Sequence, residues 1–357
     1  MPRTLTIGSH EISDTSRCYV VAEVGHNHQG KLQTCMDLFK AAKEAGVSAV
    51  KLQKRNNRGI YTKSLYDKPY DNENSYGATY GEHREALEFG LSEYRTLRQY
   101  CKDLGVDFFA TAFDVDSADF LASIDMPAFK IASGDLKNIP LMEHVARFGR
   151  PMIISTGGAT LDDVKRAYYA VMAINKQVCL LQCTAGYPAE WRELDLRVIS
   201  TYRERFPEVV VGLSAHDNGI AMAVAAYVLG GRVVEKHFTL NRAWKGTDHA
   251  FSLEPVGMRK MVRDLDRTWL AMGDGQKKMY PSEVSPIQKM GKKLVAARRL
   301  PAGHMLSRED IAIKSPGDGL PPYELNNIIG LVLEQPVEED DELTFHMLKK
   351  ASEFARL

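Results

Sequence analysis

The sequence has few cysteines, and their spacing matches no disulfide or zinc-binding pattern. Its 357 residues include five cysteines, an odd number, and no two of them form a C-x-x-C pair. Neither a disulfide framework nor a thiolate zinc site is indicated, and free thiols fit a reducing compartment such as the cytoplasm. The five are Cys18, Cys35, Cys101, Cys179 and Cys183.

The sequence also lacks an excess of charge of either sign and any long hydrophobic run. Lysine and arginine number 46 and are balanced by 46 aspartates and glutamates. This balance argues against a protein that binds nucleic acid or an anionic membrane through its net charge. The longest apolar stretch, residues 220–229, is too short to span a bilayer, and the first residues show no hydrophobic signal segment. We therefore expect a cytoplasmic protein with small-molecule partners.

Short β-branched runs alternate with longer amphipathic segments from Cys18 to about Gly273. This alternation is typical of repeated βα units and a parallel sheet. Eight units favour a closed (β/α)8 TIM barrel over an open doubly wound sheet, whose G-x-G-x-x-G phosphate pattern is replaced here by GHNHQGK. The expected strands are 19–24, 49–53, 107–111, 128–131, 152–155, 178–182, 209–213 and 233–236, with helices such as 31–45, 92–104, 218–229 and 255–271.

A second, smaller module is expected after the barrel. The turn-rich, polar stretch MGDGQKKMYPSEVSP predicts a linker over residues 276–289, between a barrel of residues 1–275 and a module of residues 290–357. The module contains short strands and the Pro- and Gly-rich loop KSPGDGLPPYEL. A chain of this size buries only about 60% of its surface, so we expect it to dock on another surface.

Polar side chains stand at the ends of several expected strands, where barrel enzymes place their chemistry. The first strand ends at Glu23 and the third at Thr111, while the second carries Lys51 and Gln53. Because side chains alternate along a strand, Lys51 and Gln53 share one face and point into the barrel. The fourth strand carries Lys130. A lysine inside a barrel is costly unless it meets an anion, so two of them predict an anionic ligand.

Hydroxyl and imidazole groups follow other strands. Ser133, Ser155 and Ser214 come after the fourth, fifth and seventh strands. Hydroxyls and backbone N–H groups near helix N-termini suit a phosphate or carboxylate, although each serine alone could simply cap a helix. His216 and His237 follow the seventh and eighth strands, which are neighbours. Two imidazoles there suit a divalent metal acting as a Lewis acid, although each alone could only form hydrogen bonds within its loop.

The motifs follow one another in the order of a known enzyme family. They are VAEVGHNHQG (21–30), VKLQK (50–54), FKIASGD (129–135), MIISTGG (152–158), LQCTAGYP (181–188), GLSAHD (212–217), EKHFT (235–239) and WKGTDHAFSLEP (244–255). Together they resemble the sialic acid synthase family, whose members join a (β/α)8 barrel to a small C-terminal SAF (antifreeze-like, β-clip) domain. The stretch SYGATYGEHREALEF (75–89) is similar to the animal-type N-acylneuraminate-9-phosphate synthases, which use a 6-phosphorylated sugar.

The resemblance implies a set of site residues. His216 and His237 would hold a divalent metal, Mn or Mg first, with Co, Fe or Zn as alternatives. Phosphoenolpyruvate would be bound by Lys51, Lys130, Ser133, Ser155 and Ser214. The sugar and the reacting carbons would be surrounded by Glu23, Gln53, Thr111, Asp135, Tyr187 and Asp248. Of all these, Glu23, Lys51, Lys130 and Asp248 would be catalytic, with Glu23 orienting or deprotonating water.

The resemblance also implies a reaction and a partner. C3 of phosphoenolpyruvate would attack the aldehyde of an acyl-amino hexose or its 6-phosphate, water would add at C2, and phosphate would leave by C–O cleavage. Family members form homodimers in which the SAF domain of one subunit covers the barrel mouth of the other, here through residues 314–322. Two departures leave the acyl group open: Ala185 stands where many bacterial synthases have Asn, and Ser315 where they have the Arg of an RPG motif.

The segment after the second strand is a candidate reader of a sugar 6-phosphate. It carries a cluster of basic and aromatic side chains, which suits a phosphate. Acidic residues of the same segment neutralise much of this charge, so a solvated loop is the alternative. The basic residues of the cluster are Lys54, Arg55, Arg58, Lys63, Lys68, His83 and Arg84, and the site candidates among the residues of the segment are Lys54, Arg58, Lys63, Tyr80, His83 and Arg84.

Other functions stay open at this point. The nearest is the same chemistry on an unphosphorylated sugar, as in an N-acetylneuraminate, legionaminate or pseudaminate synthase. A pyruvate aldolase, or another phosphoenolpyruvate-using synthase of the ketodeoxy-sugar type, would share the barrel, lysines and metal but needs no SAF domain. A non-catalytic carbohydrate-binding or ice-binding protein would fit the antifreeze-like module, although inward lysines have no use on a flat ice-binding surface.

Overall fold

The structure is a computed structural model that describes residues 3–354, and it has two compact units that divide between Gly273 and Asp274. Residues 1–2 and 355–357 of the expected ranges 1–275 and 290–357 lie outside the described part. The segment predicted as a linker, 276–289, contains most of helix α12 (Pro281–Met290), which its turn-rich composition did not indicate. Pro281 begins this helix and Glu283 accepts a 2.7 Å hydrogen bond from the Tyr280 N–H, a capping arrangement that outweighs the turn-rich composition.

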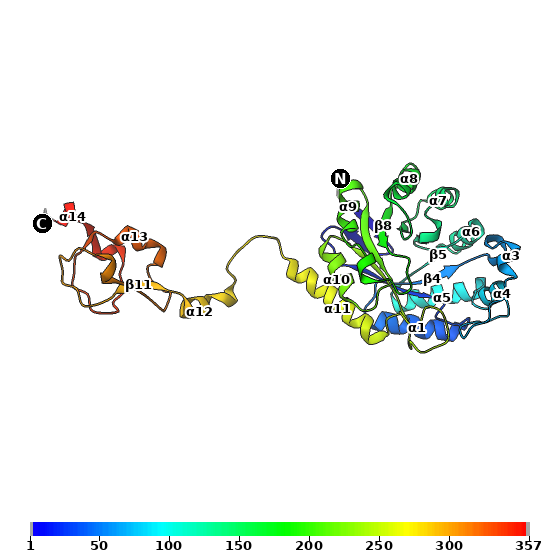
Figure 1. Cartoon of the computed structure of the whole chain (residues 1–357), viewed down its shortest axis with the longest axis horizontal. Coiled ribbons are helices and arrows are strands. Elements are labelled where there is room, and N and C mark those ends of the chain that lie inside the picture. The colour runs from blue at the N-terminus through cyan, green and yellow to red at the C-terminus, as the bar shows by residue number, and fades with distance from the viewer. Residues whose placement is uncertain (1–2, 355–357) are drawn as a thin grey trace. The chain divides into compact units, whose positions relative to one another are not determined.

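Eight parallel strands close into a barrel in the first unit, which confirms the (β/α)8 prediction (Figure 1). The order around the barrel is β10-β3-β4-β5-β6-β7-β8-β9, so the last strand pairs with the first. Every expected strand is present, with its ends shifted by at most two residues. The bounds are β3 (Tyr19–Gly25), β4 (Ala49–Lys54), β5 (Asp107–Ala112), β6 (Phe129–Ile131), β7 (Met152–Ser155), β8 (Val178–Cys183), β9 (Val210–Ala215) and β10 (Val233–His237).

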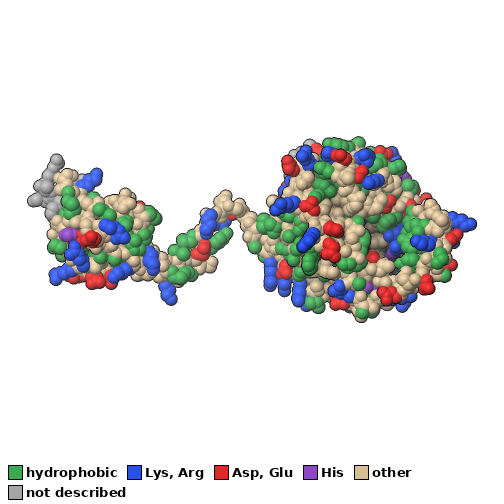
Figure 2. Space-filling view, viewed as in Figure 1, with side chains coloured by type: hydrophobic (Ala, Val, Ile, Leu, Met, Phe, Trp, Pro, Cys, Tyr) green, Lys and Arg blue, Asp and Glu red, His purple; other side chains and the backbone are tan. Residues whose placement is uncertain are grey.

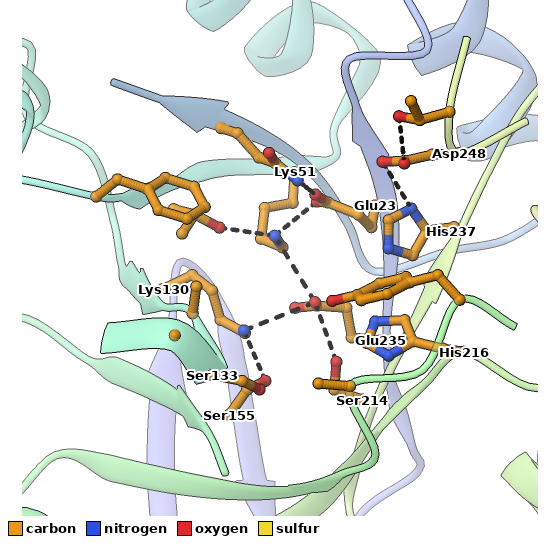
Figure 3. A pocket seen from close by; sticks show the side chains of 18 of the residues that line it. Glu23, Lys51, Lys130, Ser133, Ser155, Ser214, His216, Glu235, His237 and Asp248 are labelled. Atoms are coloured by element: carbon orange, nitrogen blue, oxygen red, sulfur yellow. Dashed lines mark hydrogen bonds and ion pairs between the residues drawn. The ribbon is translucent and has the colours of Figure 1, made fainter. Parts of the chain in front are cut away.

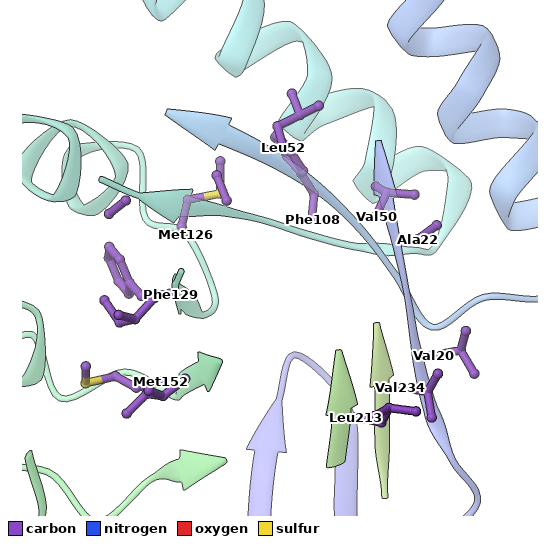
Figure 4. Packing of buried hydrophobic residues seen from close by; sticks show 14 of the residues in the cluster. Val20, Ala22, Val50, Leu52, Phe108, Met126, Phe129, Met152, Leu213 and Val234 are labelled. Carbon is purple, nitrogen blue, oxygen red and sulfur yellow. The ribbon is translucent and has the colours of Figure 1, made fainter. Parts of the chain in front are cut away.

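The connecting helices cover the outside of the barrel. Outward-facing strand residues such as Val20, Val50, Leu52 and Phe129 are buried against them (Figure 4). The helices are α1 (Leu32–Glu44), α5 (Leu91–Leu104), α6 (Val115–Ser123), α7 (Ile139–Ala146), α8 (Leu161–Met172), α9 (Val198–Arg205), α10 (Ala221–Val228) and α11 (Pro255–Met272). The segment after β4, for which no helix was predicted, contains three short helices: α2 (Asn57–Ile60), α3 (Lys63–Tyr66) and α4 (Tyr80–Glu85).

A hairpin closes the floor of the barrel. β1 (Thr4–Ile7) pairs antiparallel with β2 (His10–Ser13), and neither strand was predicted. Its residues Leu5, Ile7 and Ile12 are buried in one cluster with inward-facing strand residues, among them Phe109 and Ile153. An isolated two-stranded hairpin is marginally stable, so this one depends on the apolar floor that it covers, which no local pattern reveals.

At the other end of the strands the barrel interior becomes polar. On β3 the inward-facing side chain changes from Val21 to Glu23, and on β10 it changes from Val233 to Glu235. Because side chains alternate between the interior and the helix layer, these polar groups reach the mouth without disturbing the outer core. The barrel thus presents a polar mouth above an apolar floor.

The second unit has short strands around a core of its own. β11 (Lys293–Ala296) pairs antiparallel with β12 (Ile311–Lys314), and β13 (Leu331–Leu333) with β14 (Leu348–Lys350), beside helices α13 (Leu325–Ile328) and α14 (Ala351–Phe354). Burial raises the pKa of Asp310, but hydrogen bonds from His304, Ser307 and Arg298 outweigh it and hold the pKa well below its usual range. An ionised carboxylate therefore ties the turn before β12 to its neighbours.

Basic and acidic side chains share the surface. Both signs are interspersed over the drawn face of each unit, in keeping with the balanced composition (Figure 2). Among residues 3–354, no helix has the length and hydrophobicity that crossing a bilayer requires.

We expect Ile7→Ala to lower the free energy of unfolding by about 2–5 kcal/mol, the usual cost of deleting a buried aliphatic side chain. Ile7 is 0% exposed in the barrel floor. Chemical denaturation followed by circular dichroism measures the loss. Thr6→Ala, at the exposed neighbouring position of the same strand, is the matched control and should change stability by about 0.5 kcal/mol or less. Equal losses in the two variants would contradict the role of the hairpin.

Candidate active site

A cavity of about 550 Å³ opens at the carboxyl ends of the barrel strands. Each of the eight strands, or the loop that follows it, contributes to its wall. Thirteen of the residues expected in a site line it: Glu23, Lys51, Gln53, Arg84, Thr111, Lys130, Ser133, Ser155, Tyr187, Ser214, His216, His237 and Asp248. The strand-end positions inferred from alternation are thus brought together around one space.

Two buried lysines dominate the floor of this cavity (Figure 3). The Lys51 ammonium lies 2.6 Å from Glu23 Oε2 and donates a 2.8 Å hydrogen bond to Thr111 Oγ1. Both ammonium groups are 3.7 Å from the same oxygen, Oε1 of Glu235. Glu235 therefore connects the two lysines electrostatically.

Hydroxyl groups complete the surroundings of the lysines. The Lys130 ammonium donates a 2.7 Å hydrogen bond to Ser155 Oγ, and Ser214 Oγ lies 3.4 Å from Glu235 Oε1. Ser133 Oγ accepts a 2.9 Å hydrogen bond from the N–H of Gly157. A side chain at Gly157 would come within 2.8 Å of this hydroxyl, so glycine is required for the contact. Ammonium, hydroxyl and backbone N–H groups together form a surface suited to a phosphate or carboxylate.

The two buried carboxylates have different proton affinities. Burial raises the pKa of Glu23 to about 7, an effect that Lys51 opposes and the nearby Glu235 reinforces. Burial also raises the pKa of Glu235, but the ammonium groups of Lys130 and Lys51 outweigh it and bring the pKa below the usual value. Glu235 therefore stays ionised at neutral pH, whereas Glu23 can exchange a proton there.

The side of the cavity next to β9 and β10 holds a histidine pair. The ring centroids of His216 and His237 are 5.3 Å apart. Nδ1 of His216 lies 2.9 Å from the Thr184 carbonyl oxygen, a contact that orients the ring. Nδ1 of His237 is buried without a hydrogen-bond partner, 3.7 Å from Asp248 Oδ2. Burial lowers the pKa of His237 more than Asp248 raises it, so the imidazole is in its neutral, metal-binding form.

These donors fit an open metal site rather than a closed one. Within residues 3–354 there is no group of three or more His, Cys, Asp or Glu side chains that could hold a metal ion. The histidine pair can supply two ligands, and further positions would be left to water or substrate oxygens. Catalytic metal sites keep such positions open, so the residues present are compatible with the expected divalent ion.

Six expected site residues do not line the cavity. Lys54 pairs with Glu88 at 3.2 Å, and the Arg58 guanidinium stacks 4.3 Å from the ring centre of Tyr66. Lys63 is exposed in α3. The six are Asp135, Lys54, Arg58, Lys63, Tyr80 and His83. Arg58, Tyr80 and His83 instead contact other residues of the folded segment 57–85, which its composition alone did not reveal.

Three polar residues of the cavity wall were not among the site residues named from the sequence: Arg55, Thr247 and Glu235. Glu235 is two residues before His237 on β10, and Arg55 is two residues after Gln53. The alternation rule that placed Lys51 and Gln53 on one face applies equally to both. That signal was present, but Glu235 was noted only as part of the EKHFT motif, and Arg55 only as one of the basic residues of its segment.

Comparison with known proteins identifies the family of the chain. Residues 38–277 match the profile of the NeuB family, and residues 293–349 match that of the SAF domain. The chain is 39% identical over 325 residues to a human protein named N-acetylneuraminate-9-phosphate synthase, covering 91% of this chain and 90% of that one. It is 34% identical over 320 residues to the N,N'-diacetyllegionaminic acid synthase of Legionella pneumophila, covering 88% and 89%.

Two solved structures of similar proteins superpose on most of the chain. N-acetylneuraminic acid synthetase from Leptospira borgpetersenii, in complex with citrate, superposes with a TM-score of 0.70 at 28% identity, covering 80% of this chain and 96% of that one. The spore coat polysaccharide biosynthesis protein SpsE from Bacillus subtilis superposes with a TM-score of 0.66 at 30% identity, covering 97% and 99%. The chain belongs to the NeuB family and carries a SAF domain after its barrel.

Proposed function

We propose that this chain condenses phosphoenolpyruvate with N-acetylmannosamine 6-phosphate, or a related acyl-amino hexose phosphate, to give an N-acylneuraminate 9-phosphate and phosphate. At the coarser level the chain is a synthase of the sialic, legionaminic and pseudaminic acid type, a transferase. The observation that carries the proposal is one cavity in which two buried ammonium groups adjoin a histidine pair.

Phosphoenolpyruvate is assigned to the side of the cavity around Lys51 and Lys130. Its phosphate and carboxylate would be held by these ammonium groups and by Ser133, Ser155 and Ser214. Charge-assisted hydrogen bonds are stronger than neutral ones, so the two lysines position the substrate for reaction. Glu235 lies 3.7 Å from both ammonium groups and partly compensates their charge while no substrate is bound.

The proposed reaction forms a bond between C3 of phosphoenolpyruvate and the sugar and breaks the bond between C2 and the phosphate. C3 of phosphoenolpyruvate bonds to the aldehyde carbon of the sugar, whose oxygen takes up a proton and becomes a hydroxyl. The electron pair of the new carbon–carbon bond comes from the C2=C3 π bond, which leaves a cationic C2, and water adds there and gives one proton to Glu23. The bond between C2 and the phosphate oxygen then breaks, while the new C2 hydroxyl gives its remaining proton to the departing phosphate and becomes a ketone. A divalent ion bound at His216 and His237 would supply Lewis-acid polarisation of the aldehyde oxygen. Asp248, beside His237, is placed to hold sugar hydroxyls or to exchange a proton.

The 6-phosphorylated sugar is favoured by the named relatives. Those from human, mouse and fruit fly, at 36–39% identity, are all N-acetylneuraminate-9-phosphate synthases. The alternative, an unphosphorylated acyl-amino hexose, is favoured by the legionaminic acid synthase at 34% identity.

We further propose a cytoplasmic homodimer in which the SAF domain of one subunit covers the barrel mouth of the other through residues 314–322, by resemblance to the family.

Phosphate release from phosphoenolpyruvate with Mn tests the proposed reaction. We expect a larger kcat/KM with N-acetylmannosamine 6-phosphate than with N-acetylmannosamine. A preference for the free sugar would leave the synthase chemistry standing and refute the phosphorylated substrate. Release of phosphate with neither sugar would refute both acceptors.

The acid–base role of Glu23 predicts both a rate and a pH dependence. Glu23→Gln should lower kcat by about 10²–10⁴-fold, the usual contribution of a positioned acid or base. In the wild type kcat/KM should fall as the pH drops below about 7, because Glu23 becomes protonated and no longer accepts the proton of water. This limb should be missing from the residual activity of the variant. Glu44→Gln, at the exposed end of α1, is the control and should keep the wild-type profile.

The metal assignment predicts loss of both metal and activity in His237→Ala. Turnover should fall by more than about 100-fold, and bound metal measured by mass spectrometry should fall with it. The control is His144→Ala, on the outer helix α7, where the imidazole pairs with Asp119. Full activity of the wild type in rigorously metal-free buffer would refute the assignment.

A further inference from the structure

Two arginines line the same cavity and take no part in the chemistry described above. They are Arg55, which follows β4, and Arg84, in α4. Arg55 is buried, with 8% of its surface exposed, and Arg84 is partly buried. A buried guanidinium normally has a carboxylate partner, because leaving its charge uncompensated is costly.

Neither arginine has such a partner in the part of the chain that the structure describes. Within residues 3–354, no carboxylate oxygen lies within ion-pair distance of either guanidinium. The nearby carboxylate of Glu88 pairs with Lys54 at 3.2 Å, and that of Asp248 faces His237 at 3.7 Å. The charge of the two guanidinium groups is therefore left for something that enters the cavity.

Neutral groups hold the arginines in place instead. The Arg55 guanidinium stacks 3.8 Å from the ring centre of Phe113 and donates a 2.6 Å hydrogen bond to Gln53 Oε1. Arg84 donates from two of its nitrogens to the Tyr80 hydroxyl, at 3.0 and 3.1 Å. Both side chains are thus oriented before any ligand arrives, while part of their N–H donors stay free.

His26 lies between the two guanidinium groups and cannot satisfy both. Its Nε2 is 3.0 Å from Arg55 and its Nδ1 is 3.2 Å from Arg84. Burial, with the charges of Arg55 and Arg84, holds the pKa of His26 well below its usual value, so the ring is neutral. A neutral imidazole accepts at only one nitrogen, so one guanidinium faces an N–H. An anion contacting both arginines would relieve this mismatch and their mutual repulsion.

A hydrogen-bonded chain connects the arginines to the reaction centre. The side-chain amide of Gln53 donates a 2.6 Å hydrogen bond to Glu23 Oε1, and its oxygen accepts one from Arg55. Gly25, with φ +52°, lets the backbone pass close to the side chains of Glu23, Gln53 and Asp248. A Cβ atom at this position would lie 3.1–3.7 Å from them. A ligand whose reactive end lies near Glu23 can therefore place an anionic group at its far end against the arginines.

We propose that Arg55 and Arg84, spaced by His26, form a second anion subsite that binds the 6-phosphate of the sugar. This inference rests on the proposed function, and it separates the sugar phosphate from the phosphoenolpyruvate phosphate at the lysines. A phosphate dianion matches two guanidinium forks in charge and geometry. The proposed pair is thus part of the basic cluster expected from the sequence, and Lys54, Arg58 and Lys63 of that cluster do not line the cavity.

The test uses Arg55→Gln and Arg84→Gln in the full chain. Steady-state kinetics with N-acetylmannosamine 6-phosphate and with N-acetylmannosamine give the ratio of the two kcat/KM values. Each variant should lower this ratio by about 10–100-fold, mainly through KM for the phosphorylated sugar, because charge-assisted hydrogen bonds are lost. KM for phosphoenolpyruvate should change less than about twofold. Arg84→Lys should recover part of the preference because it restores the charge.

The matched control is Arg58→Gln, on the same segment but stacked on Tyr66 away from the cavity, and it should keep the wild-type ratio. Thermal melting checks that each variant is folded. A wild type that prefers the phosphorylated sugar, with variants that keep this preference, would overturn the subsite and leave the proposed function intact. A wild type that prefers the free sugar would overturn both.

If neither sugar is turned over, the proposed function fails and calorimetric binding of N-acetylmannosamine 6-phosphate decides the subsite. Binding to the wild type that is lost in Arg55→Gln would support it. Equal binding to the two proteins, or none to the wild type, would overturn it.

Discussion

The mutual pairing of two lysines and two glutamates inside the barrel mouth is the interaction on which the site depends. Lys51 meets Glu23 on the neighbouring strand, whereas Lys130 on β6 reaches Glu235 on β10 across the interior. An isolated charge buried there would cost several kcal/mol and would not persist. The pairing exists because closure of the barrel brings β10 beside β3 and opposite β6. If the sheet were open on both sides of β10, Glu235 would lie away from both lysines.

This cluster also gives its two carboxylates different tasks. Glu235 faces both ammonium groups, and its pKa falls below the usual value. Glu23 faces Lys51 and an amide, and burial raises its pKa to about 7. Neighbouring groups that shift the pKa values of two carboxylates in opposite directions provide one permanent charge and one proton acceptor. The apolar floor beneath them, sealed by the β1–β2 hairpin, maintains the burial that makes these differences large.

The cavity combines two kinds of cationic surface. The lysines are point charges that carboxylates already compensate, which suits a phosphate that must leave after the C–O bond breaks. The arginines are planar, oriented by neutral groups and uncompensated within residues 3–354, which suits an anionic group that stays attached to the sugar. In our proposals these surfaces hold the two phosphates of the reaction, and Gln53 connects them through Glu23 and Arg55.

The amino-acid sequence alone was enough for the barrel, its eight strands, and the lysines and histidines at its mouth, because alternation along a strand and polarity at its end are local signals. It did not reveal the floor hairpin, whose short strands are stable only against residues distant in the chain. Nor did it separate Arg55 and Arg84, which face the cavity, from Lys54 and Arg58, which do not. The direction of a side chain in the segment after β4 depends on how helices α2 to α4 pack, and only the tertiary structure decides that.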